Sequence, residues 1–401
     1  MTYPGGHLGA QFIPVMRPKL PTAVEILPYL ETIDAHRWYS NWGPLVTRLE
    51  EQLARRLSVP SESVVTAANC TAGLTAALLA REVPAGSFCI MPSWTFAATP
   101  HAARGAGLIP WFHDVDPATW ALNPDTVADS VKQMHPRPGA VIAVSPFGAP
   151  IDIQAWEAFE AHTGIPVIVD AAAGFDTVRA SKIPCVVSLH ATKILGAGEG
   201  GFISTTDAGL ADRLRACCNF GFRDSRSAMA PAMNAKMSEY HAAVALASLA
   251  AWPSTRAQHT RISERYAAAL APLAEVTPQP GYGIGWVSAT TSVLLPPGSA
   301  LSISERLNHT GIESRSWWGA GCHLQPAFAD CPREVLATTE DLGSRVLGLP
   351  HFLDLRPSDV DRVVQALSET LRAWSLRNLS ERISETRHYL VGTPEPEPCS
   401  K

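Results

Sequence analysis

Seven short, nearly continuous apolar runs constrain the fold of this chain more than any other feature. They are rich in Val, Ile and Phe, and they occupy 62–68, 87–91, 108–113, 140–145, 166–170, 185–190 and 201–205. Strands that are buried on both faces have this composition. Helix-like stretches separate several of the runs; in 45–57, for example, leucines recur every four residues and share one helical face. This alternation predicts an α/β fold in which helices cover a mainly parallel sheet.

Two features refine this expectation. Helices are also predicted at 71–81, with Thr71 as a candidate cap, and at 153–164, which ends in a glycine that stops the helix. The link 193–200 is too short to be a crossover between parallel strands, so one strand beside it is predicted to run antiparallel.

The pattern changes after about residue 255, where helical stretches flank shorter strand-like pieces. A helix near 238–251 is expected to connect two domains. We therefore predict an N-terminal arm at 1–40, a large cofactor-binding domain at 41–254, a smaller C-terminal α+β domain at 255–376 and a tail at 377–401.

Composition excludes several classes of protein. Apolar residues make up 46% of the 401 residues and the net charge is -5, so a sizeable core is available. No basic run indicates nucleic acid, and no apolar stretch reaches the roughly 18 residues of a membrane span. The N-terminus does not resemble a signal peptide. The eight cysteines show no CxxC spacing, so we expect no metal site, reduced thiols and a cytoplasmic location.

Four chemically informative residues follow the predicted strands. Asp170 ends one strand, Lys193 follows the next, Thr71 opens a helix and Phe96 follows 87–91 through a short turn. Taken alone, each has an ordinary explanation as a turn, surface, cap or core residue. If the strands are parallel, all four lie at the sheet edge where ligands bind in open α/β folds.

As a set, these residues have the chemistry that pyridoxal phosphate (PLP) requires. A lysine forms an imine, a carboxylate keeps the pyridine nitrogen protonated, a helix N-terminus with a hydroxyl holds the phosphate, and an aromatic ring stacks on the cofactor. Competing motifs are weaker: the glycines at 196–201 do not open a helix, and no GxxxxGK[ST], HExxH or GxSxG motif occurs.

The segment SLHATKILGAGEGGFIST at 188–205 resembles the cofactor-lysine segment of the PLP-dependent fold-type-I nucleotide-sugar aminotransferases, the DegT/DnrJ/StrS family. The resemblance extends over about 10–375 and is closest to viosamine- and perosamine-forming members. Its other blocks, in the family's order and spacing, are 41–54, 69–80, 91–99, 114–125, 148–152, 234–246, 314–328 and 347–352.

The resemblance implies a large domain with a mostly parallel seven-stranded sheet, and it implies residue roles. Lys193 would form the Schiff base and move the proton, and Asp170 would pair with the pyridinium nitrogen. Asn234 would reach the phosphate of the partner subunit, which implies a homodimer with shared active sites. The implied cofactor-binding positions are Cys70, Thr71, Ala72, Phe96, Asp170, Ala173, Ser188, His190, Lys193 and Asn234.

Two positions depart from the family pattern. Ala173 stands where the family usually has a glutamine that bonds the phenolic oxygen of the cofactor, so water or His190 would have to replace it. For His190, the alternative is a buried, hydrogen-bonded histidine. Cys70 stands where glycine is usual, so either a left-handed residue is strained there or the turn does not require one.

The implied reaction moves an amino group, with L-glutamate as the expected donor, through pyridoxamine phosphate to a nucleotide-linked keto-deoxy sugar, for amino-sugar or polysaccharide biosynthesis. The resemblance also implies substrate-binding residues. For the tryptophans among them the alternative role is core packing, and for the arginines the alternative role is a surface salt bridge. These substrate residues are Asn41, Trp42, Arg223, Arg226, Trp317 and His323.

Three other functions stay open at this point. The first is a PLP-dependent sugar dehydratase, in which histidine replaces the lysine that is present here as Lys193. The second is another fold-type-I lyase acting on an amino acid. The third is a non-catalytic regulator, although no DNA-binding segment is appended to this chain.

Overall fold

The large domain is built on a seven-stranded sheet, as the apolar runs predict. The computed structural model describes residues 12–223 and 225–391, with side chains up to residue 377. Each predicted run contains one strand: β1 (Val64–Ala67), β2 (Phe88–Pro92), β3 (Ile109–His113), β4 (Ala140–Val144), β5 (Val167–Asp170), β6 (Cys185–Ser188) and β7 (Gly201–Ser204).

The strand order is β1-β7-β6-β5-β4-β2-β3. Strand β7 pairs antiparallel with both β1 and β6, and the other described pairs of this sheet are parallel. The antiparallel strand predicted next to 193–200 is therefore confirmed, because a short loop can only return the chain beside the strand it leaves. Since β1 and β6 run in the same direction, their carboxyl ends lie at the sheet edge that Asp170 also occupies.

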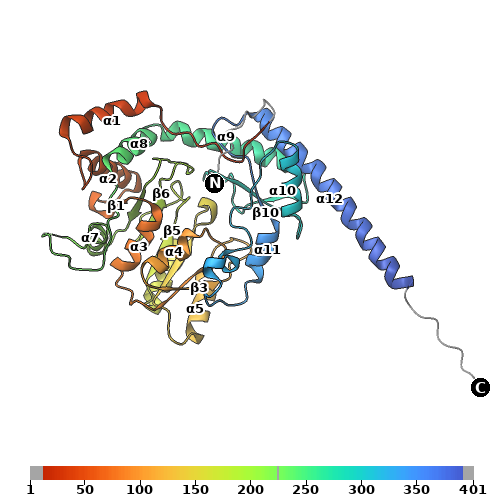
Figure 1. Cartoon of the computed structure of the whole chain (residues 1–401), viewed down its shortest axis with the longest axis horizontal. Helices are drawn as coiled ribbons and strands as arrows, with labels where there is room; N and C mark the ends of the chain where they lie inside the picture. Colours follow the sequence, from red (N-terminus) through yellow and green to blue (C-terminus); the bar gives the residue numbers. More distant parts are fainter. Residues whose placement is uncertain (1–11, 224, 392–401) are drawn as a thin grey trace, which may run out of the picture.

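Helices cover both faces of this sheet (Figure 1). Neighbouring residues of β4, such as Val141 and Ile142, belong to different buried clusters, as expected for a strand with two buried faces. One cluster includes α3 (Cys70–Ala80), α4 (Ala98–Gly105) and α7 (Ala208–Cys217). The other includes α1 (Ala23–His36), α2 (Pro44–Leu57), α5 (Pro124–Gln133), α6 (Ile153–Thr163) and α8 (Glu239–Ala250).

The C-terminal part forms a smaller α+β unit with its own buried cluster, in which Tyr266, Ile303, Leu347 and Leu367 are fully enclosed. Its antiparallel sheet has the order β10-β9-β8. The elements are α9 (Trp252–Leu270), β8 (Thr277–Pro278), β9 (Thr291–Leu294), α10 (Ala300–His309), α11 (Ala337–Arg345), β10 (Val346–Leu349) and α12 (Pro357–Val391). Short 3-10 helices are η1 (Ser61–Ser63), η2 (Pro146–Gly148), η3 (Cys322–Leu324) and η4 (Pro326–Phe328).

The predicted domain limits can be compared with the bounds of the observed helices. The connecting helix predicted at 238–251 corresponds to α8, and α9 follows it after Ala251 alone. The limit at 254/255 falls in the first turn of α9. The limit at 376/377 falls inside α12, whose C-terminal part projects away from the rest of the molecule (Figure 1). The tail beyond residue 391 and the first residues of the predicted arm lie outside the described residues.

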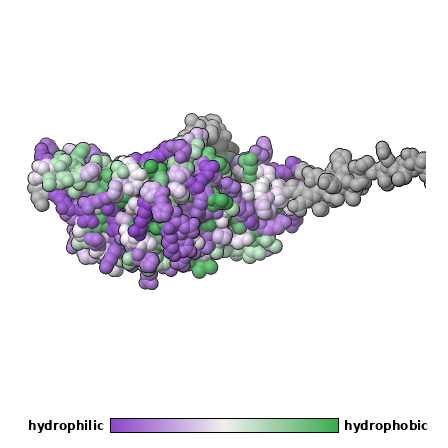
Figure 2. All heavy atoms as spheres, turned by 90° about the horizontal axis from the view of Figure 1, so that it is seen from below, coloured by the Kyte–Doolittle hydropathy of each residue, from purple (hydrophilic) through white to green (hydrophobic). Residues whose placement is uncertain are grey.

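The surface and the thiols agree with the composition. On the face seen in Figure 2, hydrophilic and hydrophobic residues are interspersed. Among the described residues, none of the helices is long and apolar enough to cross a membrane. Seven cysteines lie in the described ranges and all of them are unpaired.

A buried histidine pair should make the stability of the C-terminal unit depend on pH. His259 Nδ1 lies 2.9 Å from His351 Nε2, and both rings are buried. Burial lowers the pKa of His259 to about 4, although Asp176 opposes this, and burial and His259 lower the pKa of His351 well below its ordinary value. Below about pH 6.5 the unfolded chain therefore binds protons that the folded chain excludes, so stability is lost as the pH falls towards 4, by about 3 kcal/mol for His259 alone.

Urea unfolding at pH 7 and pH 4.5 measures this loss. Carboxylates also titrate in this interval, so the informative quantity is the difference between wild type and His259→Gln, which should lose less stability on acidification. His309→Gln, at an exposed position, is the matched control and should keep the wild-type slope. An unchanged slope in His259→Gln would contradict the prediction.

Candidate active site

Asp170 is the buried acid at the carboxyl edge of the sheet. It is the last residue of β5 and only 5% exposed. Its Oδ2 accepts a hydrogen bond from Thr99 Oγ1 at 2.8 Å, and its Oδ1 accepts one from the backbone N–H of Ala172 at 3.1 Å. Burial raises the pKa of Asp170, whereas the two hydrogen bonds and the charge of Lys193 lower it. The site thus holds a buried acid whose pKa stays above its ordinary value, because two donors and a positive charge only partly offset the burial.

Lys193 lies on a tight turn after β6. Its N–H donates to the His190 carbonyl at 2.9 Å, and Ser248 Oγ of α8 donates to the Gly196 carbonyl at 2.6 Å, so the turn is held from both ends. Burial lowers the pKa of Lys193, while the negative charge of Asp170 opposes the shift. A lowered pKa increases the neutral fraction of an amine, which makes it a better nucleophile and proton acceptor. Lys193 follows β6, which pairs in parallel with the strand that Asp170 ends, so both residues lie at the same edge of the sheet.

The N-terminus of α3 supplies backbone donors next to this pair. The helix begins at Cys70 and its cap is Asn69, whose Oδ1 accepts the N–H of Ala72 at 2.8 Å. The prediction of Thr71 as the cap is therefore wrong, and the N–H of Ala72 is not available for a phosphate, because the asparagine one residue before the helix already bonds it. Within the described chain, the N–H groups of Cys70 and Thr71 have no hydrogen-bond partner, which suits an anion.

Cys70 resolves one of the two departures from the family pattern. It is the first residue of α3 and does not have a positive φ. The turn therefore does not require a left-handed residue, and a side chain is tolerated here. The thiol is buried, and burial raises the pKa of Cys70 well above its usual value, so the group is a neutral thiol.

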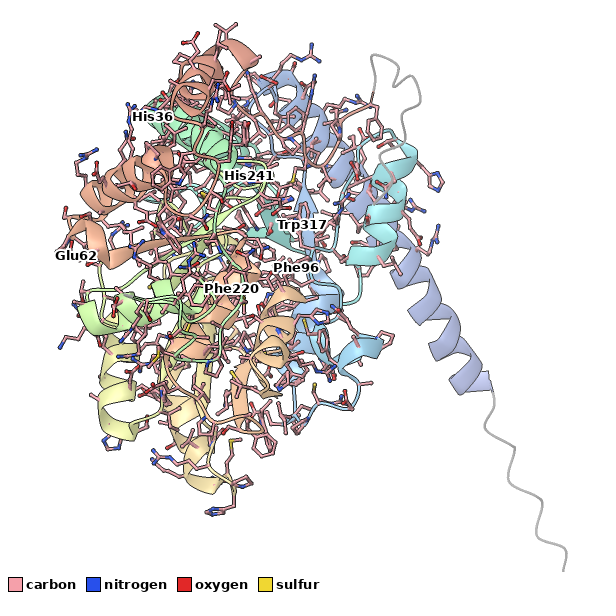
Figure 3. The ribbon with its side chains drawn as sticks, turned by 60° about the vertical axis from the view of Figure 1, so that its left-hand side comes forward. His36, Glu62, Phe96, Phe220, His241 and Trp317 are labelled. Carbon is pink, nitrogen blue, oxygen red and sulfur yellow. The ribbon has the colours of Figure 1, made fainter. Side chains whose placement is uncertain are left out.

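The remaining cofactor positions lie on the same edge. Ser188 ends β6, and its buried hydroxyl accepts the N–H of His190 at 3.2 Å. Phe96 follows β2, and 59% of its surface is exposed, so a face of its ring is open to a ligand (Figure 3). Ala173 packs against η2, because a side chain on Gly148 would come within 2.5 Å of the Ala173 carbonyl.

His190 does not fit the alternative of a buried histidine, because 44% of its side chain is exposed. Its Nδ1 lies 2.8 Å from Thr192 Oγ1, and its Nε2 lies 3.7 Å from Glu199 Oε1. Both ring nitrogens thus face partners within the lysine turn. The described structure does not show His190 bonded to Ala173 or Asp170.

Three implied substrate residues have structural partners. Trp42 Nε1 donates to Glu50 at 3.0 Å, and the guanidinium of Arg215 lies 5.5 Å from its ring centre. The ring of Trp317 has the guanidinium of Arg315 at 5.2 Å. His323 is buried, and its Nδ1 lies 2.7 Å from the Ser93 hydroxyl, so it contacts the segment before Phe96.

The other implied residues are on the surface. Asn41 is exposed and has a left-handed φ of 61°. Arg223 forms an exposed ion pair with Asp212 at 2.8 Å, as its alternative explanation predicted, and Arg226 is exposed. Asn234 is exposed, and its Oδ1 accepts a hydrogen bond from Lys236 at 2.6 Å. In this single chain these four residues do not meet the Asp170–Lys193 pair.

Sequence reasoning missed three residues that build the site: Asn69, Thr95 and Thr99. Asn69 had a signal, because asparagine is a preferred cap and stands directly before the helix. Thr95 and Thr99 are four residues apart, yet nothing in the sequence connects them to Asp170, which lies 71 residues further along the chain.

The residues present fit PLP. A primary amine with a lowered pKa, a buried carboxylate, a helix N-terminus with free N–H groups and an open aromatic side chain occupy one sheet edge. These groups correspond to the imine, pyridine, phosphate and ring-face contacts that the cofactor needs.

Comparisons with known proteins agree with this geometry. Residues 22–368 match the DegT/DnrJ/EryC1/StrS aminotransferase family. Protein Rv3402c of Mycobacterium tuberculosis is 30% identical over 381 residues, covering 91% of this chain and 92% of that protein. A putative PLP-dependent aminotransferase from Bacillus cereus has a TM-score of 0.82 at 28% identity, covering 89% of this chain and 100% of that one. DesI, solved in the presence of its TDP-sugar product, has a TM-score of 0.82 at 32% identity, covering 94% of this chain and 97% of DesI.

These findings confirm the predicted fold class, PLP fold type I, and the predicted enzyme class, a PLP-dependent aminotransferase. They also favour an enzyme over the alternative of a non-catalytic regulator. The chain belongs to the DegT/DnrJ/EryC1/StrS aminotransferase family.

Proposed function

We propose that this enzyme transfers an amino group from L-glutamate to a nucleotide-linked keto-deoxy sugar, in amino-sugar or polysaccharide biosynthesis. The observation that carries the proposal is the placement of Asp170 and Lys193 after the paired strands β5 and β6, next to the N-terminus of α3, where Cys70 contacts the Val186 carbonyl. A sugar substrate is supported by the likeness to DesI, which was solved with a TDP-sugar product.

Each residue has a defined task in this proposal. Asp170 would pair with the ring nitrogen of PLP and keep it protonated, and the cofactor, when bound, would supply an electron-withdrawing ring that stabilises negative charge on the substrate carbon. The N-terminus of α3, Thr71 and Ser188 would hold the phosphate, and Phe96 would contact the ring. Lys193 Nζ would anchor the cofactor and would accept a proton from the donor carbon as a general base, which its lowered pKa favours.

The proposed enzyme is a homodimer whose subunits share their sites. Asn234 is exposed in the segment that follows α7, as expected for a residue that reaches the partner's phosphate. Phe220 in the same segment is 46% exposed, which supports coverage of this segment by a second subunit. The cytoplasmic location stays a prediction.

The test is a panel of nucleotide-linked keto sugars incubated with L-glutamate and the holoenzyme, with products identified by mass spectrometry. We expect at least one sugar to gain an amino group and glutamate to become 2-oxoglutarate in equal amount. Reactions without glutamate are the control. Loss of water from the sugar without gain of nitrogen would identify a dehydratase, and turnover of an amino acid without any sugar would identify a lyase.

A further inference from the structure

Two buried threonine hydroxyls stand behind the acid of the site. Thr99, in the first turn of α4, is fully buried and donates from Oγ1 to Asp170 Oδ2 at 2.8 Å. Thr95 is 1% exposed, and its Oγ1 lies 2.8 Å from Thr99 Oγ1. A charged carboxylate only accepts hydrogen bonds, so the single hydroxyl proton of Thr99 is directed at Asp170, and the proton of Thr95 is directed at Thr99. The pair forms a chain of donors that ends on the acid.

Asp170 depends on such donors because it is buried. Burial raises its pKa, and three partners oppose this: the Thr99 hydroxyl, the Ala172 N–H and the charge of Lys193. Ala172 belongs to the segment that carries Asp170, and the amine of Lys193 takes part in the proposed chemistry. Thr99 is therefore the side-chain donor that holds the carboxylate from a separate element throughout the reaction.

A loop of the C-terminal part fixes the segment that carries this pair. The Cys322 N–H donates to the Ser93 carbonyl at 2.8 Å, and the Cys322 thiol donates to the Thr95 carbonyl at 3.2 Å. His323 approaches the Ser93 hydroxyl at 2.7 Å. The backbone of Thr95 is thus held in place by Cys322. The imidazole of His323 contacts the same segment at Ser93.

We propose that Thr99, supported by Thr95, is a positioning residue that keeps Asp170 charged and aimed at the ring nitrogen of the cofactor. This inference rests on the role assigned to Asp170 in the proposed function. Removal of the Thr99 hydroxyl would raise the pKa of Asp170 and leave the ring nitrogen less protonated. A hydrogen bond to a charged group that is lost in a buried site corresponds to roughly a tenfold or larger effect.

The test compares Thr99→Val, which keeps the shape but removes the hydroxyl, with Thr99→Ser, which keeps the hydroxyl. Full-length holoenzyme carrying PLP labelled with ¹⁵N in the ring is studied by NMR across pH, because the nitrogen signal reports its protonation. Equilibrium dialysis measures cofactor retention. We expect Thr99→Val to lose ring protonation at a lower pH than wild type and to retain PLP about tenfold more weakly. Thr99→Ser should restore both.

Thr75→Val is the matched control. Thr75 is a buried threonine of α3 whose hydroxyl donates to the Ala102 carbonyl of α4 at 3.2 Å, without contact to Asp170. We expect it to lower the melting temperature and to leave the nitrogen titration unchanged. Thr95→Val should move the titration in the direction of Thr99→Val, by a smaller amount, and it serves if Thr99→Val does not fold.

The outcomes separate this inference from the proposed function. If Asp170→Asn loses ring protonation while Thr99→Val and Thr95→Val titrate as wild type does, the role of the threonines is refuted and that of Asp170 stands. Failure of Thr99→Ser to restore the titration would also refute the role of the threonines, because the loss of the hydroxyl would then not explain the shift seen in Thr99→Val. If Asp170→Asn itself titrates as wild type, the proposed site is wrong.

Discussion

Lys193→Ala is expected to reduce kcat for amino transfer at least about a thousandfold, because it removes both the covalent anchor of the cofactor and the general base. Burial already lowers the pKa of this amine, and hydrogen bonds at His190 and Gly196 fix the turn that carries it. No other described residue combines these properties. The measurements are kcat with glutamate and the keto sugar found in the panel, and the visible absorbance of the cofactor joined to Lys193, which should disappear.

Lys182→Ala is the control for this substitution. Lys182 lies shortly before β6, and it is exposed to solvent, whereas Lys193 is not. It should keep wild-type kcat and absorbance. Full activity in Lys193→Ala, with the fold intact by circular dichroism, would remove the basis of the assignment.

Asp170→Asn is expected to lower kcat about a hundredfold to a thousandfold, the size of effect seen when one preorganised electrostatic partner is removed from an active site. Asparagine has the same shape, but its neutral amide cannot balance a protonated ring nitrogen. The amide oxygen can still accept the Ala172 N–H, and the Thr99 hydroxyl can accept a hydrogen bond from the amide nitrogen, so the fold should persist. Steady-state kinetics and a melting curve separate these effects: kcat should fall while the melting temperature changes little.

Asp176→Asn is the matched control, because Asp176 is a second buried aspartate six residues further along the chain. It accepts hydrogen bonds from Arg256 Nε at 2.9 Å and from the Val287 N–H at 3.2 Å, so it joins the two parts of the molecule. Its replacement should lower the melting temperature and leave kcat of the folded enzyme nearly unchanged. Equal losses of kcat in both variants would mean that Asp170 acts through stability alone.

The sequence was most informative where a residue's neighbours along the chain decide its state. The seven strands follow from local runs of Val, Ile and Phe, and the antiparallel β7 follows from the short link 193–200. The same holds for Asp170, which ends one strand, and for Lys193, which follows the next in a short turn, since the carboxyl ends of parallel strands meet at one edge. The error at Thr71 was local too, by two residues, because Asn69 competes for the same cap.

Contacts between distant segments could not be read from the pattern. The hydrogen bond from Thr99 to Asp170, the His259–His351 pair and the contact of His323 with Ser93 each join residues at least 71 positions apart. Each depends on how helices and loops pack on the sheet, which no local periodicity encodes. The exposure of His190 was likewise decided by tertiary packing, which leaves its side chain partly open to solvent.

The amino-acid sequence by itself therefore determined the α/β architecture and the placement of Asp170 and Lys193 at one edge of the sheet, because strand burial and strand ends are local properties of the chain. Only the tertiary structure decided which hydroxyls contact Asp170, which N–H groups remain free at α3, and which predicted residues are held elsewhere. The physical reason is that hydrogen-bond partners and desolvation, and hence pKa values, are set by side chains brought together from remote parts of the chain.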